Sequence, residues 1–381
     1  MEAYFDNAAT TAVFPEVKDL MIKLMEEDYG NPSSLHMKGV QAEKYLKEAK
    51  TRIARQLKCQ EKELVFTSGG TESNNLAIIG AAMAKRRMGK HIITSAVEHA
   101  SVLDTLNFLE KEGFEVTKLC VDEHGRVLLD ELKESLREDT ILVSVMYVNN
   151  EIGTVEPVNE IAEIVKGHNP NILIHVDAVQ AFGKLNFAPK NLKVDLLSIS
   201  GHKIHGPKGS GILYIKDKTL IRPIIYGGGQ QKAMRSGTEN VPAYAGLGLA
   251  TEIIYKDHDK KIQYIQSLKD SFIEKVTAFE DVYNNSQDAP HIASVSFVGV
   301  RSEVMLHALE ERGIYVSAGS ACSSNKPHIS GVLSSIGMPS ERLESTLRFS
   351  FSVNNTMEQV EYAVGVIGEL LPMLRRYVRK K

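Results

Sequence analysis

Residues 197–209 read Leu197-Ser198-Ile199-Ser200-Gly201-His202-Lys203-Ile204-His205-Gly206-Pro207-Lys208-Gly209. A short apolar run here ends in Ser, His and Lys and passes into a glycine-rich turn. A second run, Ile174-His175-Val176-Asp177, ends in an acid 26 residues before Lys203. Both runs have the length and composition of buried strands. Because open parallel sheets present ligand-binding groups just after their strands, the two runs predict such a sheet with a site at its edge.

On both sides of this stretch, apolar β-branched runs alternate with helical patterns. Such alternation is typical of a mostly parallel sheet covered by helices on both faces, so we predict an α/β fold. The predicted strands are His91–Ser95, Glu115–Cys120, Ile141–Tyr147, Ile172–Val176, Leu196–Ile199 and Gly211–Ile215, and the predicted helices are Pro15–Glu27, Lys38–Gln56 and Thr71–Met88.

The pattern changes in the last third of the chain. One long helical pattern runs from about Thr238 towards Glu280 and links two domains. Beyond it we predict a smaller α/β domain. The predicted large domain is 14–255, and the predicted small domain combines 1–13 with 256–381. The strands expected in the small domain are Ile292–Val298, Gly313–Ser317 and Thr346–Phe351, with helices at Ser302–Glu311 and from Met357.

Composition excludes several classes of protein. Of 381 residues 43% are hydrophobic and 24% charged, and the net charge of -3 gives no general attraction to nucleic acid or anionic membranes. No apolar stretch is long enough to span a bilayer, and the N-terminus has no signal-peptide pattern. Three widely spaced cysteines form neither a disulfide framework nor a zinc motif. We therefore expect a cytoplasmic protein without a metal.

Asp177 and Lys203 have ordinary explanations when each is taken alone, as a helix N-cap and a surface lysine. Together at neighbouring strand ends they match the needs of pyridoxal phosphate (PLP). This cofactor needs a lysine that holds its aldehyde covalently and an acid that keeps its pyridine nitrogen protonated. The protonated ring then accepts electrons from the substrate Cα.

A phosphate cradle is predicted at residues 67–75, which read Thr67-Ser68-Gly69-Gly70-Thr71-Glu72-Ser73-Asn74-Asn75 after an apolar run. Small residues let backbone N–H groups approach a phosphate, and a helix N-terminus favours an anion. Ser200 and His202 would complete this site. Three further polar residues also follow strand-like runs: His99 could stack on the cofactor ring, Asn150 could bond the cofactor or substrate, and Gln180 could reach the ring oxygen.

The ordered set of motifs resembles the NifS/IscS-like cysteine desulfurases, which are class V aminotransferases of PLP fold type I. The resemblance extends from Asp6 to about Phe351. It rests on Asp6-Asn7-Ala8-Ala9-Thr10-Thr11, Gly30-Asn31-Pro32-Ser33-Ser34, Asp177-Ala178-Val179-Gln180, Ser200-Gly201-His202-Lys203 and Arg235-Ser236-Gly237-Thr238-Glu239-Asn240.

The resemblance implies a role for each matching residue. Lys203 would carry PLP, Asp177 would pair with its ring nitrogen, His99 would stack on the ring and serve in proton transfer, and Gln180 and Asn150 would lie on the ring-oxygen side. Arg348 and Asn31 would bind the substrate, Arg348 through its carboxylate. Thr238 would reach the phosphate of a neighbouring subunit, which implies a homodimer. The residues implied at the phosphate are Gly70, Thr71, Ser200 and His202.

The segment Ser317-Ala318-Gly319-Ser320-Ala321-Cys322-Ser323-Ser324 separates this group from its relatives. The resemblance implies that Cys322 takes sulfur from L-cysteine as a persulfide, with alanine as the second product. Cys59 and Cys120 are interpreted as structural. Sulfur-acceptor proteins, such as those of Fe–S cluster assembly, are the implied partners. The chain departs from the usual family pattern at Gly227-Gly228-Gly229-Gln230-Gln231 and after Arg348, at Phe351-Ser352-Val353-Asn354-Asn355-Thr356.

Three other functions remain open at this point. A selenocysteine lyase or another class V aminotransferase would use the same cofactor groups, although an aminotransferase would not need Cys322. A scaffold that had lost catalysis would keep the fold without binding PLP. The sequence leaves the destination of the sulfur open, because Fe–S assembly, tRNA thiolation and thio-cofactor synthesis all draw on this family.

Overall fold

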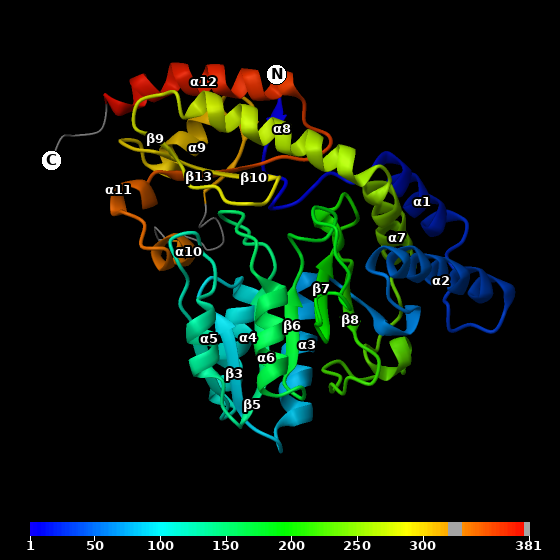
Figure 1. The fold of residues 1–381 in the computed structure, drawn as a ribbon. Coiled ribbons are helices and arrows are strands. Elements are labelled where there is room, and N and C mark those ends of the chain that lie inside the picture. Colours follow the sequence, from blue (N-terminus) through cyan, green and yellow to red (C-terminus); the bar gives the residue numbers. More distant parts are fainter. Residues whose placement is uncertain (319–329, 377–381) are drawn as a thin grey trace.

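The computed structural model describes residues 1–318 and 330–376. A large sheet forms the lower half of the molecule in Figure 1, and a smaller sheet lies above it. The predicted α/β fold with a mostly parallel sheet is confirmed, and this sheet has seven strands. The strand order is β2-β8-β7-β6-β5-β3-β4. These strands are β2 (Leu64–Thr67), β3 (His91–Ser95), β4 (Glu115–Leu119), β5 (Thr140–Met146), β6 (Leu173–Asp177), β7 (Leu196–Ser200) and β8 (Gly211–Ile215).

Strands β4, β3, β5, β6 and β7 run parallel to one another, whereas β8 is antiparallel to β7 and to β2. The central strands are buried along their whole length because both faces of the sheet are covered. The carboxyl ends of β5, β6 and β7 therefore open onto one edge of the sheet.

Two layers of helices cover the large sheet. On one face α3 and α4 pack into an apolar cluster, and on the other face α1, α2, α5, α6 and α7 share a larger cluster with the strands. The bounds are α1 (Pro15–Glu26), α2 (Met37–Leu57), α3 (Gly70–Lys85), α4 (Ala100–Lys111), α5 (Leu129–Ser135), α6 (Val158–His168) and α7 (Val241–Tyr255), with short 3₁₀ turns η1 (Glu61–Glu63), η2 (Gly201–Lys203) and η3 (Gln230–Ala233).

The smaller part has its own apolar core. Its antiparallel sheet has the order β12-β13-β10-β9, and a separate two-stranded sheet pairs β1 with β11. The strands are β1 (Ala3–Tyr4), β9 (Val282–Asn284), β10 (Ile292–Phe297), β11 (Ile314–Tyr315), β12 (Ser317–Ala318) and β13 (Thr346–Ser350), and the helices are α8 (His258–Val276), α9 (Ser302–Glu310), α10 (Gly331–Ser335), α11 (Ser340–Leu343) and α12 (Met357–Arg375).

Two predicted elements were wrong in detail. The single helix expected from Thr238 towards Glu280 is two helices, α7 and α8, which are separated at Asp257, a residue with φ of 53°. Left-handed backbone at Asp257 cannot continue a helix, and no Gly or Pro in the sequence marks this break. The single strand expected at Gly313–Ser317 is β11 and β12, which pair in different sheets.

The first residues of the chain connect the two parts. In Figure 1 the N-terminus lies beside α12, and the chain passes from there to α1. Asn7 Nδ2 donates to the main-chain oxygen of Ser350, and Ala8 N donates to Ser350 Oγ. The domain boundary predicted between residues 255 and 256 falls at the end of α7 and stays a prediction. None of the helices among residues 1–318 and 330–376 is long and apolar enough to cross a membrane.

Candidate active site

A cavity of about 590 Å³ lies at the carboxyl ends of β5, β6 and β7. Residues from distant stretches of the chain, between Asp6 and Arg348, line it, among them most of the predicted site residues. These predicted residues are Gly70, Thr71, His99, Asn150, Asp177, Gln180, Ser200, His202, Lys203 and Arg348. The interpretation that polar residues after neighbouring strands meet at one edge of the sheet is therefore confirmed.

Lys203 ends the turn η2 that directly follows β7. Its Nζ donates hydrogen bonds to the main-chain oxygens of Ala8 and Ala9, at 2.6 and 2.7 Å. The N-terminal segment thus fixes the amine at the cavity wall. This partner was not predicted, because 195 residues separate Ala8 from Lys203 in the sequence.

Asp177 is the last residue of β6 and is buried. Its two carboxylate oxygens accept hydrogen bonds from Asn74 Nδ2 at 2.7 Å and from Val179 N at 2.9 Å. Burial raises the pKa of Asp177 above its ordinary value, while these two bonds and the nearby His99 and Lys203 favour the charged form. A cation placed against this carboxylate would restore its charge.

The phosphate side of the predicted site is a second cavity of about 440 Å³, which shares Ala9, Gly70, Thr71, Ser200 and His202 with the first. The N-terminus of α3 points into it, and unpaired N–H groups at a helix start favour an anion. The approach of the backbone here needs glycine. A Cβ on Gly211 would lie 2.6 Å from the Cα of Gly69, and one on Gly70 would lie 2.7 Å from Val179 Cγ2.

His202 and Glu72 both line this second cavity. Burial, aided by the charges of Lys203 and Lys208, lowers the pKa of His202 to about 4, so its ring is neutral near pH 7. His202 Nδ1 lies 3.2 Å from Thr10 Oγ1.

Glu72 accepts two hydrogen bonds from Arg235, at 2.8 and 3.2 Å, and one from Ser68 N. Arg235 thus compensates the acid that stands at the phosphate side.

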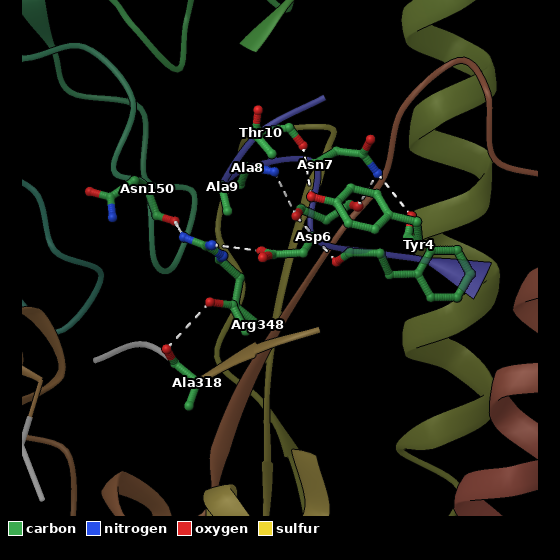
Figure 2. A network of polar contacts seen from close by, with 12 residues as sticks. Tyr4, Asp6, Asn7, Ala8, Ala9, Thr10, Asn150, Ala318 and Arg348 are labelled. Carbon is green, nitrogen blue, oxygen red and sulfur yellow. Dashed lines mark hydrogen bonds and ion pairs between the residues drawn. The ribbon is translucent and has the colours of Figure 1, made fainter. Parts of the chain in front are cut away.

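Arg348 lies on β13 and reaches the cavity from the smaller part of the molecule (Figure 2). Nη1 donates to the main-chain oxygen of Asn150 at 2.7 Å, and Nη2 pairs with Asp6 Oδ1 at 2.9 Å. Arg348 is only 7% exposed, and its Nε is buried without a hydrogen-bond partner among the described residues. The guanidinium is therefore not fully satisfied by the described residues, and Arg348 is the cavity-lining arginine that could bind a carboxylate.

His99 and Gln180 occupy the walls of the cavity. His99 is the N-cap residue of α4, where its Nδ1 accepts a hydrogen bond from Ser101 N. Gln180 Nε2 donates to the main-chain oxygen of Ala8, and Gln180 Oε1 lies 3.2 Å from His291 Nε2. The predicted contacts of His99, Gln180 and Asn150 with a cofactor stay predictions.

Two predicted site residues among the described residues do not line this cavity. Asn31 and Thr238 are both exposed, and Asn31 Oδ1 accepts a hydrogen bond from Ser33 N. Cys322 lies outside the described residues.

Of the cysteines interpreted as structural, Cys59 is half-buried and Cys120 is exposed, so burial explains the first only. Burial raises the pKa of the Cys59 thiol to about 12.

Sequence reasoning missed six polar side chains that line the cavity, namely Asp6, Asn74, Glu98, Ser101, Glu151 and Ser317. Asn74 stands within the quoted glycine motif, where it carried no signal of its own. Glu98 directly precedes His99, and burial raises its pKa well above the ordinary value. Burial also raises the pKa of Glu151 to about 7. Both carboxyls are thus biased towards the neutral form.

The family model of the class-V aminotransferases matches residues 3–363. The chain is 45% identical to the cysteine desulfurase IscS of Dictyoglomus turgidum over 98% of this chain and 95% of that relative. It superimposes on the solved structure of a NifS-like protein with a TM-score of 0.93, at 38% identity over 98% of this chain and 100% of the other. A structure named SspA in complex with cysteine matches with a TM-score of 0.82, at 35% identity over 93% and 100% of the two chains.

Fold and cavity together define an α/β enzyme of the kind that binds its ligands beyond the carboxyl ends of a parallel sheet. The chain belongs to the class-V aminotransferase family, and within it to the NifS/IscS-like cysteine desulfurases. The resemblance identified from the sequence is thereby confirmed.

Proposed function

We propose that this chain is a PLP-dependent cysteine desulfurase, which converts L-cysteine to L-alanine and transfers the sulfur to Cys322. One observation carries the proposal: Lys203, Asp177 and Arg348 meet in a single cavity. A lysine amine, a buried carboxylate and a buried guanidinium are the groups needed to hold PLP by its aldehyde and ring nitrogen and to hold an amino acid by its carboxylate.

The residues present fit PLP. Asp177 is a buried acid whose charge a protonated ring nitrogen would balance, and the glycine cradle at Gly70 and Gly211 has no room for a Cβ. Lys203 would hold the aldehyde carbon, and Thr71, Ser200 and His202 would hold the phosphate. When bound, PLP supplies an electron sink that stabilises negative charge at the substrate Cα.

The chain's own residues would bind the substrate and move its protons. Arg348 binds the substrate carboxylate with its planar fork. Lys203 takes the Cα proton, since its amine is anchored at the cavity wall by the main-chain oxygens of Ala8 and Ala9. His99, at the start of α4, is a second group for proton transfer.

Sulfur transfer to Cys322 needs no external oxidant. The Cys322 thiolate forms an S–S bond with the substrate sulfur while the substrate C–S bond breaks. The electron pair of that bond stays on carbon, which takes a proton, so one cysteine and one thiol give one alanine and one persulfide. Support for Cys322 comes from its Ser/Ala/Gly-rich sequence context, because the residue lies outside the described residues.

We further propose a homodimer with composite sites. Thr238 is exposed and outside its own chain's cavity, which agrees with a role at a second copy. Large apolar side chains are also exposed along one stretch of α1, α2 and their connection. They are Ile22, Met25, Tyr29, Leu35, Met37 and Val40. A second copy of the chain would bury them.

The persulfide would serve sulfur-acceptor proteins in the cytoplasm, such as those of Fe–S cluster assembly. A thiol-bound sulfur at the zero oxidation level passes to another thiolate by exchange, so the acceptor is expected to present a nucleophilic thiol. A pull-down with persulfidated enzyme and cysteine-alkylated or untreated candidate acceptors would test this step.

The proposed activity is tested by assaying L-cysteine with a thiol reductant in wild type, Cys322→Ala and Cys120→Ala. Wild type and Cys120→Ala should form alanine and sulfide in equal amounts and show PLP absorption. Cys322→Ala should keep the absorption and lose about a hundredfold or more of the rate. Full alanine formation by Cys322→Ala contradicts the role of Cys322. Amino transfer to a keto acid without sulfide release points instead to an aminotransferase.

A further inference from the structure

Arg348 and Asp6 form an ion pair within the smaller part of the molecule (Figure 2). Nη2 of Arg348 lies 2.9 Å from Asp6 Oδ1, and the Arg348 side chain is 9% exposed against 20% for Asp6. Among the described residues, Asp6 is the acid that pairs with this guanidinium. Both residues line the main cavity.

The backbone holds both partners of this pair. Arg348 lies in the middle of β13, where it is registered against Ser294 of β10 and Ser317 of β12. Asp6 forms a parallel bridge with Ser350, and Ser350 N donates to the main-chain oxygen of Phe5 at 2.6 Å. Asp6 therefore comes to Arg348 on a rigid segment rather than on a free tail.

Two acceptors fix the plane of the Arg348 guanidinium. The main-chain oxygen of Asn150 takes Nη1 and Asp6 takes Nη2, while Nε remains buried without a partner among the described residues. A guanidinium has five N–H donors in a rigid planar fork, so fixing two nitrogens also fixes the direction of the third. The direction of each donor that remains is then set before a substrate arrives.

We propose that Asp6 is a positioning residue, which aligns the fork of Arg348 so that the remaining donors meet the substrate carboxylate. This inference rests on the proposed function, in which Arg348 binds that carboxylate. Asp6 does not touch the reacting atoms and acts through Arg348 alone. Holding the fork in advance removes part of the ordering that binding would otherwise require.

The negative charge of Asp6 also has an effect that opposes substrate binding. A second carboxylate near Arg348 repels the carboxylate of the substrate and weakens its binding. Asp6→Asn replaces the ion pair with a weaker neutral hydrogen bond and removes the charge. This change weakens binding if alignment dominates and strengthens binding if repulsion dominates. We infer that alignment dominates, because Arg348 is buried and has only two acceptors among the described residues to hold it.

The experiment measures binding of L-alanine and L-alaninamide to PLP-loaded enzyme by calorimetry. Both ligands have the amine and methyl group, but only alanine has a carboxylate, and neither carries sulfur. Wild type, Asp6→Asn and Asp288→Asn are compared. Asp288 is the matched control, because it pairs with Arg126 and does not line the cavity.

In Asp6→Asn we expect alanine affinity to fall about tenfold and alaninamide affinity to change less than twofold, with both affinities unchanged in Asp288→Asn. An equal loss for both ligands, an unchanged alanine affinity or a tighter one overturns the inference. If Asp6→Asn does not load PLP, Asp6→Glu replaces it. This variant keeps the charge and displaces the acceptor by one methylene, so it should also lose alanine affinity selectively, and an unaltered affinity overturns the inference.

The experiments distinguish a wrong assignment of the function from a wrong role for Asp6. Wild type that forms neither alanine nor sulfide from cysteine contradicts the desulfurase. Active wild type with Asp6→Asn indistinguishable from it contradicts only the role of Asp6.

Discussion

Asn74 Nδ2 lies 2.7 Å from Asp177 Oδ2, and this hydrogen bond joins helix α3 to the end of strand β6. Asn74 is buried, and its own Oδ1 has no partner among the described residues. A buried amide that donates to a carboxylate stabilises the charged form of the acid. Asn74 thus opposes the effect of burial, which raises the pKa of Asp177.

Replacement of Asn74 by Ala should weaken PLP binding by a factor of about 10 to 100. The reason is that a hydrogen bond to a charged group contributes about 1.5–3 kcal/mol. Loss of this bond raises the pKa of Asp177 further and weakens its pairing with the ring nitrogen. Equilibrium dialysis of PLP measures the effect. Asn75→Ala is the control, since Asn75 Nδ2 donates to the oxygen of Thr71 and not to Asp177. Equal losses in the two variants would refute this role.

Gly211→Ala should disturb the phosphate cradle. The new Cβ would lie 2.6 Å from Gly69 Cα, so either β8 or the start of α3 must move. We expect a melting temperature lower by a few degrees and PLP affinity lower by about tenfold or more. The matched control is Gly167→Ala on α6, where a Cβ meets nothing within 4 Å. Retention of full PLP affinity in Gly211→Ala would show that the close approach is not needed.

The pair Lys203 and Asp177 could be predicted because Asp177 ends an apolar strand and Lys203 ends the turn after another. Strand ends are visible in a sequence, and parallel strands bring them to one edge of the sheet. Asp6 and the oxygens of Ala8 and Ala9 could not be placed in this way. They reach the cavity through a junction between segments almost 200 and more than 300 residues apart. No local periodicity records such a contact.

Local sequence patterns also predicted most strands, but they did not predict a helix break that depends on the backbone conformation of one residue. The break between α7 and α8 occurs at Asp257, which adopts a left-handed conformation that the sequence favours only weakly. Glu98 and Glu151 were missed for a related reason. Their pKa values are raised by burial, and burial follows from tertiary packing.

The protein without PLP should lose stability as the pH falls from about 6.5 to about 4, in part because of His202. Burial lowers the pKa of His202 in the folded state to about 4, so between these values the unfolded chain binds the proton more readily. Thermal unfolding of wild type and His202→Asn across this range measures the effect. We expect a shallower decline in the variant. Parallel declines would show that His202 does not titrate in this way.

Glu151 should make the folded protein less stable as the pH rises, which is opposite to the trend expected from His202. Glu151→Gln should remove this effect. Burial raises the pKa of Glu151 in the folded state to about 7, and its Oε2 accepts a hydrogen bond from Ser330 Oγ. The folded chain therefore retains a proton that the unfolded chain has already lost above about pH 4.5. The stability that the acid contributes is present below that pH and is lost progressively up to pH 7, by at most about 3 kcal/mol. Glutamine is neutral at every pH and escapes this loss.

The melting temperature of Glu151→Gln relative to wild type should consequently rise by a few degrees between pH 5 and pH 8. The control is Glu134→Gln, a change of the same type at an exposed position on α5. Its difference from wild type should stay constant over this range. A constant difference for Glu151→Gln as well would mean that the carboxyl ionises in the folded chain as it does in the unfolded one. Burial would then not hold Glu151 neutral against the opposing charge of Arg348.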